Sequence, residues 1–333
     1  MGARLFAVAL AALVLPGAAL AADEAAHCQL RQLAEIPVST NGWSPSVAVE
    51  IDGHPARMII DTGSQFTMLT SDAAQGLGLT PAPDRGIEFY GVGGKERGRT
   101  VRIKEFKIGD FVGHNLEWPV SSHFAKGLQG LLGAGFLLQT DIEFDLPEGK
   151  IRFFKSEHCA GDQVVYWGTA YAVAPLLGPI GSKLDVTVRL NGVPVTAEMD
   201  TGAGDSMVTT AIAASAGVTV KSSGVVSGGA MRGLDGQPVQ VFVGVFRTFA
   251  FGEETISNAR IAVADMFGVD KEALFSRIPT SMVGLEMLLG ADFFRSHRIY
   301  VAREQRRVYV SYVGGPVFLA PRPPAPAPAA PAR

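Results

Sequence analysis

The sequence of 333 residues has no run of basic residues, few patterns of a long helix and only one long apolar stretch. Its formal net charge is −3, so the dense positive surface that binds nucleic acid is not expected. The segments that do show a pattern are short and rich in Val, Ile and Phe, with 39 glycines spread among them. This composition favours a mostly β protein.

Several common reactive centres are missing as well. The six histidines show no metal-ligand spacing such as His-x-x-x-His. No serine lies in a Gly-x-Ser-x-Gly turn, and neither cysteine has the surroundings of a nucleophile. We therefore expect no metal and no cofactor.

The one long apolar stretch lies near the N-terminus. Arg4 precedes an apolar core over residues 5–15, too short to span a bilayer, and residues 19–21 are Ala-Leu-Ala, a cleavage pattern. We predict a signal peptide over residues 1–21, no integral membrane segment after its cleavage, and a periplasmic or secreted protein. A lipid anchor on Cys28 is the alternative, although the residue before it does not suit lipidation.

The only two cysteines are Cys28 and Cys159. An even number in an exported chain favours one disulfide. Such a bridge would tie the N-terminal segment to the junction between the two halves of the chain. Two unpaired thiols are the alternative, because sequence alone does not prove contact.

One tripeptide occurs twice, as Asp61-Thr62-Gly63 and as Asp200-Thr201-Gly202. Each copy follows a mainly apolar segment that has the pattern of a strand. A lone buried carboxylate is costly unless it is paired or protonated. Two such carboxylates, supplied by two copies of one unit, can share a proton.

The surroundings of the tripeptide are repeated too. Asp-Gly or Asn-Gly, a strong hairpin signal, ends eight residues before each Asp. A short helical stretch follows, and later a Leu-Leu-Gly segment at 131–133 and at 288–290 precedes a closing hairpin. A strand-ending turn is the simpler interpretation of the tripeptide. Turn chemistry alone does not explain the duplicated surroundings.

These paired motifs resemble aspartic peptidases of the retropepsin/pepsin clan, in particular bacterial exported proteins with two fused retropepsin-like repeats. The resemblance spans about residues 40–313. It implies a mostly β, bilobal pepsin-like architecture of two homologous retropepsin-like β-barrel lobes with the active site between them. We place the lobes at 22–160 and 161–315, followed by a disordered Pro/Ala-rich tail over 316–333. Glu198 departs from the pattern, since the first copy has Ile59 there.

The resemblance also implies roles for the repeated residues. Asp61 and Asp200 would be catalytic. The hydroxyls of Thr62 and Thr201 would bond across to the opposite loop, and the two glycines that follow them, Gly63 and Gly202, would let the chain turn.

The residue after the tripeptide differs between the copies, Ser64 in the first and Ala203 in the second. A hydroxyl at position 64 that bonded Asp61 would favour its ionised form. On this hypothesis Asp61 is the base and Asp200 carries the proton, although the pair titrates as a unit.

Members of this clan fold a hairpin over the substrate. Glycine-rich segments at the corresponding distance after each Asp are candidate flaps, and they contain Tyr90, Gly91, Val92 and Gly93 in the first half and Gly228 and Gly229 in the second. Ordinary surface hairpins explain the same glycines. Residues 265–282 form an insertion of the second half, with a short helix predicted at 270–275.

Together these features predict an aspartic endopeptidase that hydrolyses extended peptides or flexible protein segments. Because one chain supplies both Asp residues, a monomer should be competent. The alternative is a catalytically silent peptide-binding module on the same scaffold. A third interpretation, an envelope scaffold acting through the tail, rests only on composition.

Overall fold

The structure is a computed structural model that describes residues 27–83, 87–91, 94–121, 127–178, 183–232, 238–266 and 285–318. The predicted signal peptide, Val92 and Gly93 of the first candidate flap, the helix at 270–275 and the Pro/Ala-rich segment after residue 318 lie outside these ranges. No helix within them is long and apolar enough to cross a bilayer.

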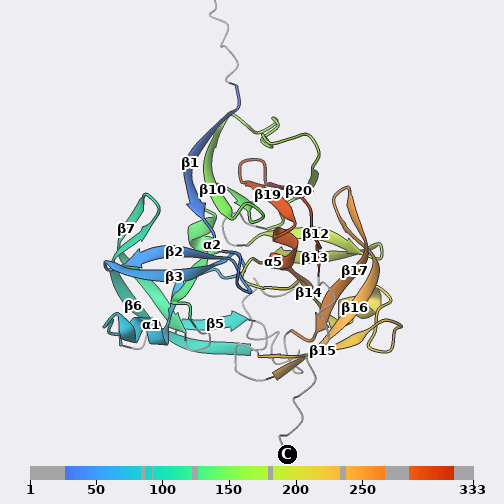
Figure 1. The fold of residues 1–333 in the computed structure, drawn as a ribbon, viewed down its shortest axis with the longest axis horizontal. Helices are drawn as coiled ribbons and strands as arrows, with labels where there is room; N and C mark the ends of the chain where they lie inside the picture. Colours follow the sequence, from blue (N-terminus) through green and yellow to red (C-terminus); the bar gives the residue numbers. More distant parts are fainter. Residues whose placement is uncertain are drawn as a thin grey trace, which may run out of the picture.

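The first half of the chain forms a closed barrel with an added hairpin (Figure 1). Its sheet has the order β2-β3-β8-β4-β7-β6-β5, and a further pairing of β2 with β6 closes it. The elements are β2 (Ser46–Ile51), β3 (His54–Asp61), β4 (Met68–Thr70), α1 (Ser71–Gly76), β5 (Ile87–Gly91), β6 (Gly94–Ile108), β7 (Phe111–Ser121) and β8 (Gly130–Gly133).

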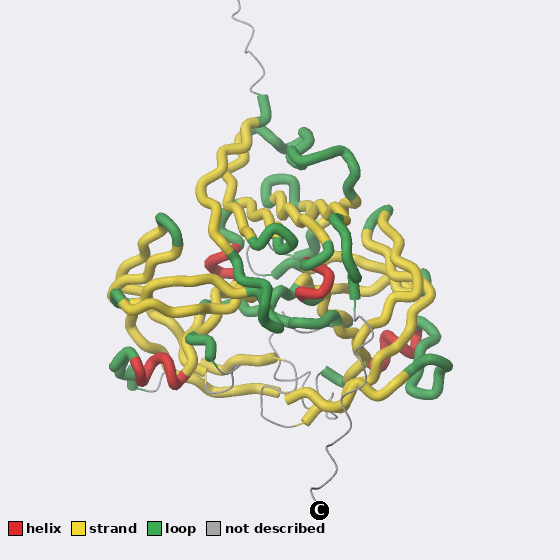
Figure 2. The backbone as a smooth tube through the Cα atoms, in the orientation of Figure 1, coloured by secondary structure: helices red, strands yellow, loops and turns green. Residues whose placement is uncertain are grey.

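The second half repeats this order strand for strand. The sheet is β12-β13-β18-β14-β17-β16-β15, closed by the pairing of β12 with β16. The elements are β12 (Asp185–Leu190), β13 (Val193–Met199), β14 (Met207–Thr209), α3 (Thr210–Ser215), β15 (Val226–Arg232), β16 (Pro238–Phe251), β17 (Glu254–Ala264) and β18 (Met287–Leu289). The predicted architecture of two homologous barrel lobes is therefore confirmed (Figure 2).

A third sheet joins the two halves, in the order β1-β10-β9-β19-β20-β11. Its strands are β1 (Gln29–Pro37), β9 (Asp141–Asp145), β10 (Lys150–Glu157), β11 (Ala172–Pro175), β19 (His297–Ala302) and β20 (Arg307–Tyr312), and the turns α2 (Ala134–Leu137) and α5 (Ala291–Phe294) precede β9 and β19. The closing hairpins of both halves thus pair with each other through β9 and β19.

A buried carboxylate neutralises the positive charges at this junction. Glu143, with no exposed surface, accepts hydrogen bonds from Arg152 of its own half and from Arg298 of the other half, the latter at 3.0 Å from Nε. Tyr166 in the connection between the halves adds a third donor at 2.6 Å. The two halves are therefore joined by charge-assisted bonds as well as by the backbone ladder.

The repeated local signals fold as predicted. Asp52-Gly53 and Asn191-Gly192 have positive φ at both residues, between 50° and 86°, as a tight hairpin turn requires. A threonine caps the N-terminus of each short helix, and its hydroxyl accepts a hydrogen bond from the backbone N–H three residues later. Thr70 accepts from Ala73 N, and Thr209 accepts from Ile212 N.

The ends of the described chain are fixed by a disulfide and by an aromatic side chain. The predicted Cys28–Cys159 disulfide is present and ties β1 to the end of β10. Phe318 is only 7% exposed and packs edge-on against Phe249 with ring centroids 4.9 Å apart. The tail was predicted to begin at residue 316, but residues 317 and 318 pack against the core of the second barrel instead. The remainder of the predicted tail lies outside the described residues.

Candidate active site

Each Asp-Thr-Gly turn lies at the end of a strand that runs through the centre of its barrel sheet. Asp61 ends β3, and Asp200 directly follows β13. The Asp61 Oδ1 accepts bonds from the backbone N–H groups of Gly63 at 3.1 Å and Ser64 at 2.9 Å. Asp200 Oδ1 accepts from Gly202 at 2.8 Å and Ala203 at 3.3 Å. Both carboxyl groups are therefore oriented by their own turns in the same way.

The two threonines hold the turns together, as the sequence resemblance implies. Thr62 Oγ1 donates to Met199 O at 2.7 Å, and Thr201 Oγ1 donates to Ile60 O at 2.8 Å. Each hydroxyl also accepts the backbone N–H of the opposite threonine, at 3.0 and 3.1 Å. Both side chains are fully buried, so these four bonds across the interface form a rigid polar network.

The glycines of the motif are required by the close approach of the carboxyl groups. A Cβ atom on Gly63 would lie 2.4 Å from Cγ of Asp200, and a Cβ atom on Gly202 would lie 2.4 Å from Cγ of Asp61. Each carboxyl group thus lies directly over the turn that carries the other. The sequence residues Asp61, Thr62, Gly63, Asp200, Thr201 and Gly202 are brought together in one site.

The shared environment raises the pKa of both carboxyl groups. Burial, and next the charge of Asp200, raise the pKa of Asp61 well above its usual range. Burial also raises the pKa of Asp200, while the backbone N–H groups of Gly202 and Ala203 oppose this. Two buried carboxyl groups this close do not readily ionise together, so the pair shares one proton and titrates as a unit.

The Ser64 hydroxyl does not make the bond to Asp61 on which the predicted choice of base depended. It donates instead to the backbone carbonyl of Phe66 at 2.9 Å, and only the backbone N–H of Ser64 reaches the carboxylate. Ala203 supplies the matching N–H in the second turn. The difference between Ser64 and Ala203 therefore does not distinguish the two carboxyl groups.

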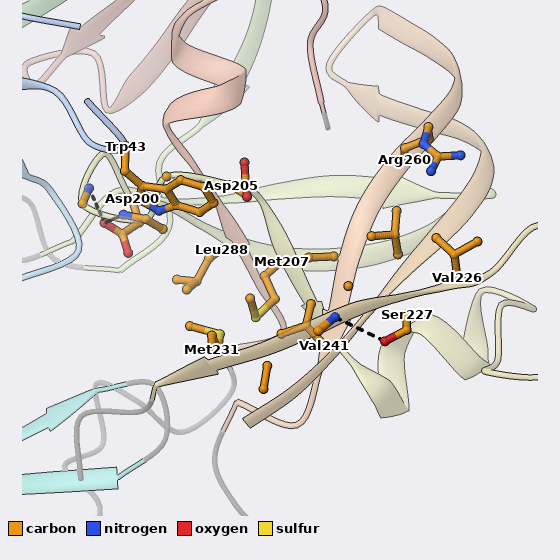
Figure 3. Close-up of a pocket in the computed structure, with 18 of the residues that line it drawn as sticks. Trp43, Asp200, Asp205, Met207, Val226, Ser227, Met231, Val241, Arg260 and Leu288 are labelled. Carbon is orange, nitrogen blue, oxygen red and sulfur yellow. Dashed lines mark hydrogen bonds between the residues drawn. The ribbon is translucent and has the colours of Figure 1, made fainter. Parts of the chain in front are cut away.

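A pocket of about 1010 Å³ opens beside the pair of carboxyl groups, mainly against the second barrel. Figure 3 shows Asp200 at one end of it and Arg260 at the other. Met207, Leu288 and Ala262 line it, and so does the segment from Val226 to Met231 of β15. This brings Gly228 and Gly229 of the second candidate flap into the same site as Asp61 and Asp200.

The first candidate flap is described only in part. The backbone of Tyr90 and Gly91 ends β5, which pairs with the start of β6 through Tyr90↔Lys95 and Gly91↔Gly94. A hairpin therefore stands where it was predicted. Val92 and Gly93 lie outside the described residues, so their contact with a substrate stays a prediction.

Trp43 is a pocket residue that sequence reasoning missed. It is 60% exposed, and its indole lies so close to Gly204 that a Cβ atom there would be 2.0 Å from Nε1. The next residue, Ser44, donates its hydroxyl to Gly202 O at 2.7 Å. A loop of the first half thus crosses to the second turn, and its one signal in the sequence was a tryptophan in a polar segment.

Glu198 lies two residues before Asp200, at the position of Ile59 in the first barrel. Because side chains alternate along a strand, Glu198 faces away from the barrel core, which contains Ala197 and Met199. It is nevertheless only 2% exposed. One carboxylate oxygen accepts a bond from Lys183, and the other has no hydrogen-bond partner. Burial raises the pKa of Glu198 to about 7, opposed by Lys183.

Asp292 is a second buried carboxyl group behind the site. Its Oδ1 accepts bonds from the backbone N–H of Ser206 at 2.9 Å and from the Ser206 hydroxyl at 2.6 Å. Burial raises the pKa of Asp292 to about 7. It fixes the turn after Asp200 without reaching the pocket.

The described residues contain no group of three or more His, Cys, Asp or Glu side chains arranged to hold a metal ion. The geometry described above belongs instead to one pair of carboxyl groups between two related barrels.

A family model described as aspartyl protease matches the chain in two segments, residues 47–136 and 186–293. Together these cover more than half of the sequence and contain both Asp-Thr-Gly turns, so the chain belongs to the aspartyl protease family. No curated protein matches the sequence.

Among solved structures, the chain is similar to an aspartic proteinase from Irpex lacteus. The TM-score is 0.51 at 14% sequence identity, over 84% of this chain and 97% of that chain. At this identity the similarity shows the bilobal fold and not a shared substrate.

Proposed function

We propose that this protein is an aspartic endopeptidase that hydrolyses peptide bonds in extended peptides or flexible protein segments. The observation that carries the proposal is the geometry of Asp61 and Asp200. The two carboxyl groups are held by matching turns, locked by four threonine bonds across the lobes, and open to one pocket. Two neighbouring carboxyl groups that share one proton are the arrangement on which the chemistry of aspartic proteases depends.

The reaction follows from one shared proton. The ionised member of the pair takes a proton from a water bound between the carboxyl groups, and the water oxygen attacks the carbonyl carbon of the scissile amide. The protonated member donates its proton to the carbonyl oxygen, which gives a neutral tetrahedral diol. The C–N bond then breaks as one diol hydroxyl returns its proton and the amine nitrogen receives one. One water is consumed, and one carboxyl group and one amine are formed.

The size and the walls of the pocket favour a peptide over a small metabolite. Its volume of about 1010 Å³ lies at the upper end of the range for small-molecule sites, roughly 300–1,000 Å³. The strand β15 forms one wall, and its exposed backbone is suited to an extended chain. Several side chains of a peptide can therefore be bound along the pocket.

Export and a monomeric state complete the proposal. The Cys28–Cys159 disulfide supports an oxidising compartment, either the periplasm or the medium. Both carboxyl groups come from one chain, so no second copy is needed to assemble the site.

A diverse peptide library incubated with the mature chain from about pH 3 to pH 8 tests the proposal. We expect cleavage that is lost in both Asp61→Asn and Asp200→Asn. Binding without cleavage by the wild type at every pH would instead support the catalytically silent peptide-binding module.

A further inference from the structure

Arg260 lies in the same pocket as the carboxyl pair, at the opposite end (Figure 3). Strand β17 places Ile261 in the barrel core with no exposed surface, so its neighbours Arg260 and Ala262 face the other way. Ala262 pairs with Met207 of β14, and both line the pocket. Arg260 therefore continues the row of side chains that begins beside Asp200.

Arg260 has no partner among the residues that the structure describes. Its Nε is buried without a hydrogen bond. Other arginines with little exposure are paired, as Arg152 is with Glu35 and Glu143. A buried hydrogen-bond donor that lacks a partner is unfavourable. A bound ligand that supplied an acceptor to Arg260 would remove this cost.

The walls between Arg260 and the carboxyl pair are apolar. Met207 and Leu288 are less than 10% exposed, and Val241 and Val243 lie on the neighbouring strand. Low polarity strengthens a charge-assisted bond and leaves the guanidinium without a competing acceptor. The planar guanidinium offers paired N–H donors that match the two oxygens of a carboxylate.

We propose that Arg260 binds a carboxylate of the peptide at a position remote from the scissile bond, and so sets a preference for acidic substrates. This proposal rests on the proposed endopeptidase function of the same pocket. The carboxylate is an Asp or Glu side chain or the C-terminus of the peptide, since both present the same two oxygens.

The first barrel shows that this arginine is not part of the repeated framework. The matching position of β7 is Glu117, three residues before Val120, as Arg260 is three before Val263. Glu117 accepts a bond from Thr100 at 2.6 Å. A residue of the opposite charge, already bonded, takes the place of the unpaired arginine.

The test compares kcat/KM for paired peptides that differ only by Asp or Glu against Asn or Gln at each position, each made with a free and an amidated C-terminus. We expect the wild type to prefer one acidic variant about tenfold or more. Arg260→Met should abolish this ratio, Arg260→Lys should restore part of it, and Arg260→Glu should shift the preference to basic peptides. Arg247→Met, which removes an exposed arginine of β16, is the matched control and should keep the ratio.

If Arg260→Met loses the preference between acidic and neutral side chains, Arg260 binds an Asp or Glu side chain. If it loses only the preference for a free over an amidated C-terminus, Arg260 binds the C-terminus of the peptide. An equal kcat/KM for acidic and neutral peptides in the wild type, or an unchanged ratio in Arg260→Met, would overturn the proposal. Binding of the same labelled peptides to Asp200→Asn, followed by fluorescence anisotropy, separates the two claims. Binding that depends on Arg260 without cleavage by the wild type keeps this inference and rejects the endopeptidase.

Discussion

The two barrels share one strand order but differ in the side chains that they turn towards the cleft. In the first barrel Ile59 packs with Met68 and Leu131 in a small apolar cluster. In the second barrel the same row has Glu198, Leu288 and Met207, and it continues to Arg260. The frame that holds the carboxyl pair is thus duplicated, while the surfaces beside it carry different charges.

This difference shows that the residues that position the carboxyl pair are separate from the residues that line the pocket. The duplicated turns place two carboxyl groups under nearly identical bonds, which any substrate would use. The unlike walls make the cleft asymmetric, so on the proposed function we expect a peptide to bind in one direction. Substitutions at matched positions of the two barrels test which features they share and which they do not.

The largest effect is expected from the two carboxyl groups themselves. Asp61→Asn and Asp200→Asn each remove the shared proton or the base, so each should lower kcat by about 10³-fold or more. The thermal midpoints should change little, because an Asn side chain can keep the bond from the turn. Steady-state kinetics and thermal unfolding of both variants check this. A loss of kcat in only one of the two variants would contradict the shared role.

Substitution of the two motif glycines should lower activity nearly as much. Gly63→Ala and Gly202→Ala each place a Cβ atom 2.4 Å from the opposite carboxyl carbon, so the pair must separate and activity should fall by at least about 10²-fold. Gly192→Ala tests positive φ alone, because nothing lies within 4 Å of its Cβ position. It should cost stability without a comparable loss of activity.

The threonine network predicts matched losses of stability from the two sides. Thr62→Val and Thr201→Val each remove a buried hydroxyl that bonds a carbonyl and a backbone N–H of the other turn. Each should lower the free energy of unfolding by about 2–3 kcal/mol, since buried partners are left unpaired. Denaturant titration measures both, and a large effect of only one would contradict the symmetry.

The disulfide fastens the N-terminal strand β1 to the central sheet that joins the two halves. The Cys28→Ser, Cys159→Ser double variant should lower the free energy of unfolding by about 2–5 kcal/mol. Activity of the folded fraction should be retained, because the bridge lies in the central sheet and not at the pocket. Unchanged stability on reduction would show that the bridge adds nothing to this sheet.

Glu198 gives a pH-dependent difference between the barrels. Its pKa is raised to about 7 by burial, so its ionisation opposes folding. The penalty is absent below the usual pKa of 4.5 and grows as the pH rises towards 7. Relative to the wild type, Glu198→Gln should therefore gain up to about 3 kcal/mol of stability between acid and pH 8. Urea titrations at several pH values check the sign, and a gain that is greatest in acid would contradict it.

The smallest expected effect is on the pH dependence of cleavage. The charge of Glu198 contributes to the raised pKa of Asp61, so Glu198→Gln should move the alkaline limb of kcat/KM to lower pH by less than about one unit. Ser64→Ala should leave the limb in place, because the Ser64 hydroxyl bonds Phe66 O instead of the carboxylate.

Much of this fold was accessible from local signals that occur twice. Asp-Gly and Asn-Gly fixed the hairpins before each motif, and Thr70 and Thr209 capped the helices after it. The residues of the carboxyl site followed from the repeated tripeptide. These signals act over a few residues, so a sequence pattern reveals them.

The features that were missed depend on distant neighbours. Trp43 contacts Gly204 in the other half of the chain. The exception is Ser64, whose hydroxyl donates to a carbonyl only two residues away. Phe318 completed a core whose other members lie about 70 residues earlier or in α5. Arg260 was not singled out in the sequence, and only the structure shows that it lines the pocket.

The central claim is that one proton shared by Asp61 and Asp200 drives peptide hydrolysis. The most direct test is the pH dependence of kcat/KM for one cleaved peptide, measured for the wild type and for both Asn variants. The account predicts a bell-shaped profile for the wild type, since one carboxyl group must be ionised and the other protonated, and only background cleavage by either variant. Wild-type rates in either Asn variant would contradict it.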